Sequence, residues 1–287
     1  MDNSDVIIIG SGPAGVSAAL YTARAGIDTM IIGGKESALL KAREIENYYG
    51  LSLPISGTDL LQNGVEQAQR LGVKILSQEV VGIKEENDRF VIETNEGSFH
   101  GKIVILATGA SRAKPKWQDI DTFDGMGVSY CAVCDGFFFR GKDVAVAGSG
   151  PYALHEAQAL LPIVGSVTLC TDGKSLTADF PPEIKIADKL VMGLEGSSTL
   201  STVRFKDGSA LEVSGLFVAI GTAGSSNLAN TIGANIKAGN IVVDTQMCTN
   251  IPKLLAAGDC TGGMKQIAKA VYEGAVAGTE AVRIFRS

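Results

Sequence analysis

The sequence has little aromatic character, few histidines and no long hydrophobic run, and each shortage excludes a class of protein. Aromatic residues make up 6% of the 287 residues, whereas glycine occurs 35 times. This balance is typical of α/β architecture, in which many tight turns join buried strands. The formal net charge of −6 argues against nucleic acid, or an anionic membrane surface, as the main partner.

The sequence also lacks the features of a secreted or membrane protein. No apolar run approaches the length of a membrane span, so we expect no membrane partner. The first expected strand begins at about Val6, which leaves no room for a cleavable signal peptide. The expected compartment is therefore the cytoplasm.

The histidines and cysteines argue against a metal site and against a structural disulfide framework. The two histidines, His100 and His155, lack metal-binding spacing, and no second C-x-x-C motif follows the one at Cys131 and Cys134. We therefore expect no metal. In a reducing compartment a C-x-x-C pair is more typical of catalysis, or of half a zinc site, than of a structural disulfide. The other cysteines are interpreted as small buried apolar residues: Cys170, Cys248 and Cys260.

Two glycine-rich segments each follow a short apolar run. The first, GSGPAG at 10–15, follows the run at 6–9, and the second, GSGPYA at 148–153, follows the run at 144–147. Glycine at such a turn lets the backbone approach a pyrophosphate, and the following helix offers free N–H groups. The alternative is a tight turn without a ligand. The strand–turn–helix context of the first segment favours nucleotide binding.

The apolar pattern predicts one βαβ opening at the start of the chain and a second one later. We expect a strand at 5–9, a helix at 13–26 and a strand at 29–32, and the second unit begins at Asp143. The apolar run at 254–259 resembles the end of the first domain's sheet, which indicates that one domain interrupts the other. The remaining expected elements are helices at 57–71 and 265–284 and strands near 73–76, 79–84, 89–93, 98–99, 103–107, 167–170 and 216–220.

The predicted fold class is α/β, with two Rossmann-like dinucleotide-binding domains joined by a two-stranded linker. The first domain comprises residues 1–113 and 225–287, and the second, of reduced size, is inserted as residues 114–224. The polar, proline-containing segment 112–116 is expected to be a linker.

Small or polar residues at the expected strand ends are candidates for a nucleotide site. Glu36 lies beyond the second strand, where a ribose-binding acid is expected. Asp259 follows a buried apolar strand, so its carboxylate points into the crevice at the carboxyl edge of the sheet, where a polyol hydroxyl is its natural partner. The segment Ala107-Thr108-Gly109 is a similar strand end, for which packing is the alternative interpretation.

Taken together, these segments resemble the low-molecular-weight flavin thioredoxin reductases over nearly the whole chain. The resemblance is carried by GSGPAG at 10–15, ENYYG at 46–50, ATGA at 107–110, CAVCDGFFFRG at 131–141, FVAIG at 217–221 and AAGDC at 256–260. It implies that the first domain binds FAD and that the protein is a homodimer whose substrate is thioredoxin. The cofactor-binding residues that we predict are Gly10, Gly12, Pro13, Ala14, Gly15, Gly34, Glu36, Asn47, Ala107, Thr108, Gly109, Gly258, Asp259, Lys265, Gln266 and Ile267.

The C-x-x-C pair has its own chemistry. Two thiols in this spacing at the start of a helix gain thiolate character, and attack on a partner disulfide proceeds through a mixed disulfide that the second thiol resolves. The resemblance implies that Cys134 faces the flavin, that Cys131 attacks thioredoxin, and that Asp135 handles the proton. It also requires the second domain to rotate about its linkers, because one disulfide must meet both partners.

The second glycine turn departs from the pattern of that family, in which this domain binds NADPH. Pro151 removes one N–H donor, and Tyr152 adds bulk beside the expected phosphates. The family has an arginine cluster after the next strand that grips the 2′-phosphate, whereas this chain has TDGK at 171–174. Asp172 would repel such a phosphate.

Two explanations of this departure compete. Asp172 could accept the ribose 2′-hydroxyl of NADH, or the site is a relic and electrons arrive from elsewhere. We favour the relic, because the second domain is short and Tyr152 obstructs the turn. This combination resembles the ferredoxin-dependent flavin thioredoxin reductases and implies reduced ferredoxin as electron donor. The alternatives are an NADH- or NADPH-dependent reductase of thioredoxin, or of a peroxiredoxin-system protein, and a flavin redox sensor without turnover.

A ferredoxin donor has a consequence for the surface. Ferredoxins are acidic, so the docking face is expected to be basic despite the negative net charge. The alternative for scattered lysines is ordinary solvated surface. The candidate residues are Lys35, Lys41, Arg43, Lys265 and Lys269.

Overall fold

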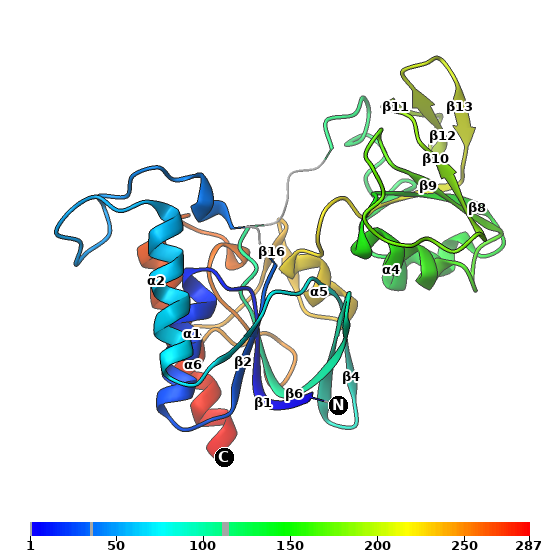
Figure 1. The fold of residues 1–287 in the computed structure, drawn as a ribbon. Helices are drawn as coiled ribbons and strands as arrows, with labels where there is room; N and C mark the ends of the chain where they lie inside the picture. The colour runs from blue at the N-terminus through cyan, green and yellow to red at the C-terminus, as the bar shows by residue number, and fades with distance from the viewer. Residues whose placement is uncertain (1, 35–36, 111–114) are drawn as a thin grey trace. The chain divides into compact units, whose positions relative to one another are not determined.

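The computed structural model describes residues 2–34, 37–110 and 115–287, and the chain forms two compact units (Figure 1). Unit 1 comprises residues 1–112 and 224–287, and unit 2 comprises residues 113–223. Unit 1 is therefore built from two separate stretches of the sequence, and unit 2 is built from the stretch between them.

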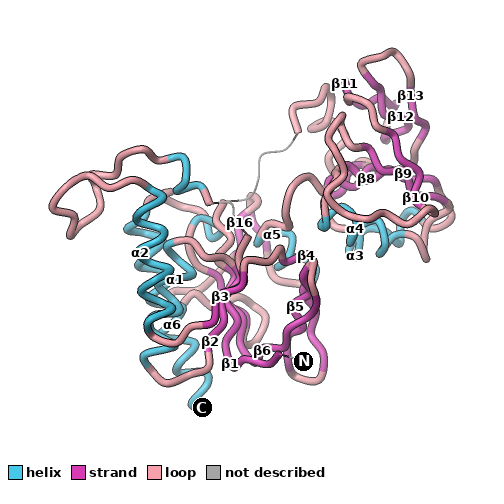
Figure 2. The backbone as a smooth tube through the Cα atoms, in the orientation of Figure 1, coloured by secondary structure: helices cyan, strands magenta, loops and turns pink. Residues whose placement is uncertain are grey.

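Unit 1 contains a seven-stranded mixed sheet in the order β3-β2-β1-β6-β5-β4, with β17 also paired to β6 (Figure 2). The pairs among β3, β2, β1, β6 and β17 are parallel, whereas β4, β5 and β6 pair antiparallel. The central parallel segments, residues 6–9 of β1, 30–32 of β2, 103–106 of β6 and 254–256 of β17, are apolar runs that are buried on both faces. The strands are β1 (Asp2–Ile9), β2 (Thr29–Ile32), β3 (Lys74–Leu76), β4 (Val80–Glu86), β5 (Arg89–Thr94), β6 (Gly97–Leu106) and β17 (Leu254–Ala256).

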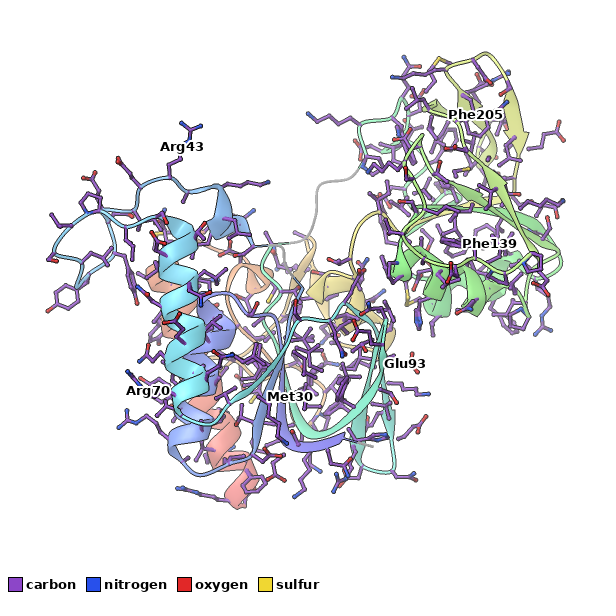
Figure 3. The ribbon with its side chains drawn as sticks, viewed as in Figure 1. Met30, Arg43, Arg70, Glu93, Phe139 and Phe205 are labelled. Atoms are coloured by element: carbon purple, nitrogen blue, oxygen red, sulfur yellow. A yellow bond between two sulfur atoms is a disulfide. The ribbon has the colours of Figure 1, made fainter. Side chains whose placement is uncertain are left out.

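Three helices lie side by side against one face of this sheet: α1 (Pro13–Arg24), α2 (Gly57–Arg70) and α6 (Ile267–Arg286) (Figure 1). The face of α6 toward α1 is built of small residues, and Gly274 and Gly278 let the two backbones approach closely. Met30 of β2, labelled in Figure 3, is fully buried in the sheet. Shorter elements complete the unit: η1 (Ala38–Lys41), α5 (Ser225–Thr231), β15 (Ile236–Lys237), β16 (Asn240–Ile241) and η3 (Asp259–Thr261).

Unit 2 contains a five-stranded parallel sheet in the order β10-β9-β8-β14-β7 and a three-stranded antiparallel sheet. The small sheet packs on the parallel one: Phe205, labelled in Figure 3, and Val203 share a core with Ala145 and Leu216. The elements are β7 (Val128–Ser129), α3 (Ala132–Asp135), η2 (Gly136–Phe139), β8 (Asp143–Ala147), α4 (Pro151–Leu160), β9 (Ser166–Cys170), β10 (Ile184–Ala187), β11 (Val191–Gly196), β12 (Leu200–Phe205), β13 (Ala210–Glu212) and β14 (Gly215–Val218).

The predicted α/β class with two Rossmann-like units is confirmed, and three details differ from the expectation. The strands expected at 98–99 and 103–107 form the single strand β6, whose first half pairs with β5 and whose second half pairs with β17. The last helix begins at Ile267 rather than at 265, because Gln266 is its N-cap. The three-stranded sheet of unit 2 was not expected.

Two further expectations concern segments of the chain. The run at 254–259 was expected to join the first domain's sheet, and β17 does so by pairing with β6. Most of the linker expected at 112–116 lies outside the described residues. Among the helices that the structure describes, none is both long and apolar enough to cross a membrane.

The close approach of α6 to α1 provides a test of the packing. A Cβ atom at Gly278 would lie 2.5 Å from the carbonyl oxygen and 3.0 Å from the Cα of Ala18. We expect Gly278→Leu to lower the free energy of unfolding by about 1–3 kcal/mol, the usual cost of overpacking. Thr279→Leu adds bulk on the exposed side of the same helix and should change it by less than about 0.5 kcal/mol. Urea denaturation would measure both, and equal stabilities would contradict the tight α1–α6 contact.

Candidate active site

The first glycine turn joins β1 to α1 and is closed on one side and open on the other. A Cβ atom at Gly10 would collide with the backbone of Ala107, and one at Gly15 would collide with the carbonyl oxygen of Gly10. Gly10 also has a φ of +115°, which favours glycine. At Gly12, by contrast, a Cβ atom would meet no other part of the chain within 4 Å. The open side is therefore the side of Gly12.

The start of α1 is suited to an anion. Gly12 is the N-cap and Pro13 is the first helical residue, and no side chain caps the helix. The free N–H groups of the first turn and the positive end of the helix therefore face the open side of the turn. A pyrophosphate is the group that such a turn binds.

Asp259 lies directly after β17, at the start of η3. Its side chain is half-buried, and no hydrogen bond to its carboxylate is found among the residues that the structure describes. The turn that carries it has glycines in the left-handed region, with φ of +91° at Gly258 and +83° at Gly262. A half-buried carboxylate at a strand end is available to accept a hydrogen bond from a ligand hydroxyl.

A buried ion pair of α6 holds the Asp259 turn. Lys269 Nζ lies 2.9 Å from Glu273 Oε2, and the two side chains are 14% and 12% exposed. Lys269 donates to the carbonyl oxygens of Gly258 and Gly262 at 2.7 and 2.6 Å. Glu273 accepts from the Gly258 N–H and the Thr261 hydroxyl, each at 2.8 Å. Charge-assisted hydrogen bonds of this kind fix the turn in place.

Two side-chain contacts bring together predicted residues that are distant in the sequence. Asn47 Nδ2 donates to Gln266 Oε1 at 3.2 Å, which joins the segment after η1 to the start of α6. Thr108 and Ser225 are joined by three contacts: Thr108 N to Ser225 Oγ at 3.1 Å, Ser225 N to Thr108 Oγ1 at 2.7 Å, and the two hydroxyls at 2.6 Å. These contacts lock the end of β6 to the start of α5.

The other predicted cofactor residues lie around the same strand ends. Glu36 lies outside the described residues. The positions of the rest are as follows: Ala14 and Gly15 are buried in α1, Gly34 is exposed after β2, Ala107 is buried after β6, Gly109 has a φ of +83°, Lys265 is exposed, and Ile267 is the first residue of α6.

This set of residues fits a flavin dinucleotide. The glycine turn and the start of α1 suit the pyrophosphate, and the Asp259 carboxylate suits a hydroxyl of the polyol chain. Both lie at the carboxyl edge of the parallel strands, where dinucleotides bind in this class of fold. The fit rests on an open turn and on a carboxylate that has no hydrogen bond among the described residues, and not on the glycine pattern alone.

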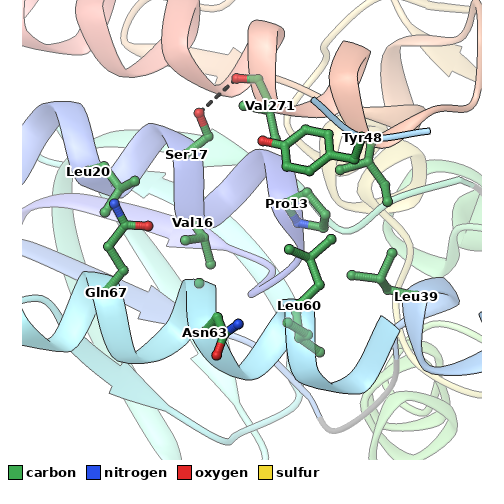
Figure 4. A pocket seen from close by; sticks show the side chains of 13 residues that line it. Pro13, Val16, Ser17, Leu20, Leu39, Tyr48, Leu60, Asn63, Gln67 and Val271 are labelled. Carbon is green, nitrogen blue, oxygen red and sulfur yellow. Dashed lines mark hydrogen bonds between the residues drawn. The ribbon is translucent and has the colours of Figure 1, made fainter. Parts of the chain in front are cut away.

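A pocket lies between the helices of unit 1 (Figure 4). Its lining includes Val16 and Leu20 of α1, Leu60 of α2 and Tyr48, and Ser17 Oγ donates across it to the Val271 carbonyl oxygen at 2.7 Å. Most of the lining comes from helix faces, and it also includes Pro13 and Ile267, two of the predicted cofactor residues. No ligand is assigned to this pocket.

The C-x-x-C pair lies at the start of α3, as predicted. Cys131 is the N-cap, and the two cysteines form a disulfide. Cys131 Sγ accepts a hydrogen bond from the Cys134 N–H at 3.2 Å, an interaction that would stabilise a thiolate at Cys131. In the oxidised form Cys131 is 4% exposed, whereas Cys134 is half-buried.

Two carboxyl groups flank the disulfide. Asp135 Oδ2 accepts from Ser129 Oγ at 2.7 Å, and Ser129 Oγ accepts from the Cys131 N–H at 3.1 Å. Glu156 of α4 is 3% exposed, and its Oε2 accepts from the Ala132 N–H at 2.6 Å. Burial raises the pKa of Glu156 to about 7, although the hydrogen bond from Ala132 opposes the shift.

The disulfide lies among exposed apolar side chains. Val133, between the two cysteines, is 60% exposed, and Phe137 and Phe138 are 64% and 75% exposed. The guanidinium of Arg140 lies 4.3 Å from the centroid of the Phe137 ring. A group of exposed apolar side chains beside a reactive disulfide is typical of a surface that binds another protein.

The second glycine turn differs from the first at its middle glycine. A Cβ atom at Gly150 would lie 3.0 Å from Thr177 Oγ1, and the Thr177 N–H donates to the Ser149 carbonyl oxygen at 2.8 Å. The segment between β9 and β10 thus packs against the turn. Tyr152, in the first turn of α4, is 3% exposed, and its hydroxyl donates to the Tyr130 carbonyl oxygen. The space that is open at Gly12 is occupied here.

Asp172 serves the fold of unit 2. Its Oδ1 accepts from the Val191 N–H at 2.7 Å, and its Oδ2 accepts from Trp117 Nε1 at 3.3 Å. Both oxygens are therefore engaged with the protein, and Asp172 has a φ of +54°. These contacts give no support to the interpretation that Asp172 accepts a ribose hydroxyl.

One of the five residues expected on the basic docking face is not available to a partner. Lys269 is largely buried in its ion pair with Glu273, so it is not available to a partner. Lys41, Arg43 and Lys265 are exposed, as expected, and Lys35 lies outside the described residues.

Sequence reasoning missed Glu273, Glu156 and Ser225, and it placed Lys269 on the docking face instead of in an ion pair. Lys269 and Glu273 are charged residues four positions apart on the small-residue face of α6, a departure from amphipathic pattern that could have drawn attention. Glu156 is likewise an acid within the buried face of α4. Ser225 lies 117 positions from Thr108, so no local pattern connects the two.

The chain matches known proteins over most of its length. Residues 4–274 match the pyridine nucleotide-disulphide oxidoreductase family. The chain is 34% identical over 281 residues to a thioredoxin reductase of Aquifex aeolicus, and the match covers 89% of this chain and 84% of the relative.

Two solved structures have a similar fold. The atypical thioredoxin reductase TRi from Desulfovibrio vulgaris Hildenborough is 41% identical with a TM-score of 0.92, over 99% of this chain and 98% of that one. A ferredoxin-flavin thioredoxin reductase from Clostridium acetobutylicum is 32% identical with a TM-score of 0.74, also over 99% and 98%. Both likenesses therefore include both units of this chain.

A substitution at Gly12 can test flavin binding without disturbing the fold. Because a Cβ atom there meets no other part of the chain, we expect Gly12→Val to leave the fold intact but to lower FAD affinity by about tenfold or more, a loss of roughly 1.4 kcal/mol. Gly64→Ala, which adds an ordinary contact 3.4 Å from Val16, is the control and should bind FAD normally. Titration of the apoproteins with FAD, with circular dichroism as a check of folding, measures this. Unchanged affinity in Gly12→Val would place the pyrophosphate elsewhere.

Proposed function

Because the chain belongs to the pyridine nucleotide-disulphide oxidoreductase family, and within it to the low-molecular-weight thioredoxin reductases, which are FAD-binding flavoproteins, we propose that it reduces the disulfide of thioredoxin with electrons from reduced ferredoxin. Unit 1 is proposed as the FAD-binding domain and unit 2 as the inserted domain that carries the redox-active disulfide. The protein is proposed to act in the cytoplasm as a homodimer.

The residues proposed to hold FAD are those at the strand ends of unit 1. The turn at Gly10, Gly12 and Gly15 takes the pyrophosphate, and Asp259 takes a hydroxyl of the polyol chain. Asn47 and Gln266, joined by their hydrogen bond, orient the segments on either side of the site. Bound FAD supplies the ability to accept electrons singly and to deliver them as a pair.

The chemistry of this chain's own residues follows from the disulfide site. After the disulfide is reduced, the Cys134 N–H stabilises a thiolate at Cys131, which attacks a sulfur of the thioredoxin disulfide. Cys134 then attacks the mixed disulfide, which releases dithiol thioredoxin and restores the Cys131–Cys134 bond. Asp135, held by Ser129, is the proposed proton carrier for the pair.

The proposal of a protein donor is carried by one observation: the middle glycine of the second turn is covered by Thr177. A nicotinamide dinucleotide would have to displace that segment before its pyrophosphate could reach the backbone. The thirteen residues at 171–183 contain three acids and one lysine, so they offer no guanidinium to a 2′-phosphate. The similarity to a solved ferredoxin-flavin thioredoxin reductase supports the same donor.

Exposed cations of unit 1 suit an acidic donor. The hydrogen bond between Asn47 and Gln266 brings the segment that carries Lys41 and Arg43 to the segment that carries Lys265. These three side chains are exposed, although the exposed Glu44 and Glu46 lie in the same stretch. The reduction of the bound flavin by reduced ferredoxin is therefore expected to slow as ionic strength rises.

The donor is tested directly with the oxidised holoenzyme. It is mixed anaerobically with NADPH, NADH or reduced ferredoxin in separate cuvettes, and the flavin absorbance is followed. We expect rapid bleaching with ferredoxin and none on the same timescale with either nucleotide, because Thr177 and Tyr152 occupy the second turn. Rapid bleaching by NADPH or NADH would overturn the ferredoxin assignment.

A cysteine variant in the same experiment separates electron entry from thioredoxin reduction. Cys131→Ser should still bleach with the donor but should not reduce thioredoxin. Cys248→Ala is the matched control, since burial raises the pKa of the Cys248 thiol to about 11 and no role in turnover is assigned to it. Thioredoxin reduction by Cys131→Ser at the normal rate would contradict the role of Cys131.

The exposed phenylalanines are proposed to dock thioredoxin. Because Phe138 is 75% exposed, Phe138→Ala should scarcely alter folding. It should raise KM for thioredoxin by about fivefold or more, the loss of roughly 1 kcal/mol expected of an aromatic interface residue, with the flavin reduction rate unchanged. Leu190→Ala, which removes a 52% exposed apolar side chain elsewhere in unit 2, is the control. Steady-state kinetics with thioredoxin decide the matter, and equal KM values for the two variants would exclude docking through Phe138.

A further inference from the structure

Glu156 is a buried carboxyl group that contacts the backbone of the disulfide segment. It lies on α4 and is 3% exposed, and its Oε2 accepts from the Ala132 N–H at 2.6 Å. Ala132 is the residue that follows Cys131 and begins α3. Within the described part of the chain, this is the one hydrogen bond found for the Glu156 side chain. The carboxyl group and the disulfide are thus linked through a single peptide unit.

The main elements packed on α4 are α3, β8 and β9, and Gly136 of η2 also lies against Leu160 of α4. None of these four described elements carries a lysine or an arginine. α3 contributes the disulfide and Asp135, whose carboxylate is bonded to Ser129. Cys170 of β9 belongs to the core shared with the three-stranded sheet rather than to the α4 side, and the charged residue of β8, Asp143, is exposed. His155 is the titratable neighbour of Glu156 on α4 itself.

Burial without a cation makes the charge of Glu156 costly. Desolvation raises its pKa to about 7, against the opposing effect of the Ala132 N–H. The group therefore changes its protonation near neutral pH while the disulfide is intact. A new negative charge nearby in a medium of low dielectric would disfavour the carboxylate further.

Reduction of the disulfide creates that charge. Breaking the sulfur–sulfur bond with two electrons leaves two sulfur anions; one takes a proton to become a thiol, and the other remains as the Cys131 thiolate stabilised by the Cys134 N–H. An ionised Glu156, which is hydrogen-bonded to the Ala132 N–H next to Cys131, would then be a second negative charge in the same buried region as the thiolate. Two interacting sites of this kind affect each other's protonation equally.

We propose that Glu156 is a positioning residue that takes up a proton from solvent when the Cys131–Cys134 disulfide is reduced and releases it when the disulfide forms again. The balance is two electrons and two protons per disulfide, one proton on sulfur and one on Glu156. The charge of the buried site is then the same in both redox states. The proposal rests on the proposed function only in taking Cys131 and Cys134 as the redox couple.

The proposal predicts a pH dependence with a defined window. Above about pH 7 Glu156 is ionised in the oxidised protein, so its protonation accompanies reduction and the reduction equilibrium constant falls an extra tenfold per pH unit, which is 29.6 mV for a two-electron couple. Below about pH 7 it is already protonated and adds nothing. Glu156→Gln keeps an acceptor for the Ala132 N–H but cannot ionise, so it should lack the extra dependence above pH 7 and match the wild type below it.

The experiment equilibrates the holoenzyme in dithiothreitol redox buffers from pH 5.5 to 9, a range on the order of one to two units either side of the Glu156 pKa. The fraction of reduced Cys131–Cys134 is measured by alkylation and mass spectrometry. It needs neither ferredoxin nor thioredoxin, so its outcome is independent of the donor and acceptor assignments. Glu212→Gln, which removes an exposed carboxylate from β13 of the same unit, is the control and should behave as the wild type. The same pH slope for Glu156→Gln and wild type above pH 7 would overturn the proposal.

A second measurement needs no variant. Infrared difference spectra of protein labelled with ¹³C in its glutamate carboxyl groups, recorded on reduction at about one unit above the Glu156 pKa, should gain the carbonyl band of a protonated glutamate. The label distinguishes this band from any contribution of Asp135. Reduction without that band would exclude proton uptake by Glu156, even if Glu156→Gln failed to fold.

Discussion

The site of unit 1 depends on a steric constraint at the first β–α turn. Gly10 and Gly15 press against backbone atoms on one side, so no side chain fits there, and this contact fixes the start of α1 beside the ends of β1 and β6. Gly12 is left on the open side. Helix α6 depends on the position of α1, which it approaches closely through its own glycines. The Lys269–Glu273 pair of α6 in turn holds the Asp259 turn at the neighbouring strand end.

The two units use the same strand–glycine turn–helix motif for different purposes. Both have a glycine turn after a parallel strand, and in both the first glycine touches the backbone of a neighbouring strand end. They diverge at the middle glycine, where unit 1 has free space and unit 2 has Thr177. In unit 2, α4 begins at the second turn and supplies Glu156, which accepts a hydrogen bond from the peptide between Cys131 and Ala132. The second turn thus sets the start of α4, the helix that positions Glu156 next to the disulfide.

Residues close in sequence were the most predictable. Continuous apolar runs and glycine turns identified β1, α1, β8 and α4, and the C-x-x-C spacing placed Cys131 at a helix start. The length of β6 was misjudged because its first half is polar, although it pairs with both β1 and β5. Contacts such as Thr108 with Ser225, or Glu156 with Ala132, join segments with no shared local pattern. Their partners are set by tertiary packing, which periodicity does not encode.

The Thr108–Ser225 contact has a consequence for the architecture of the chain. It joins the last residues before the chain leaves unit 1 to the first residues after it returns, so the exit and the re-entry are neighbours. A host domain whose cut ends are held together behaves, at that point, like a closed loop. The two cut ends of unit 1 are therefore held together by its own residues and not by those of the inserted unit 2.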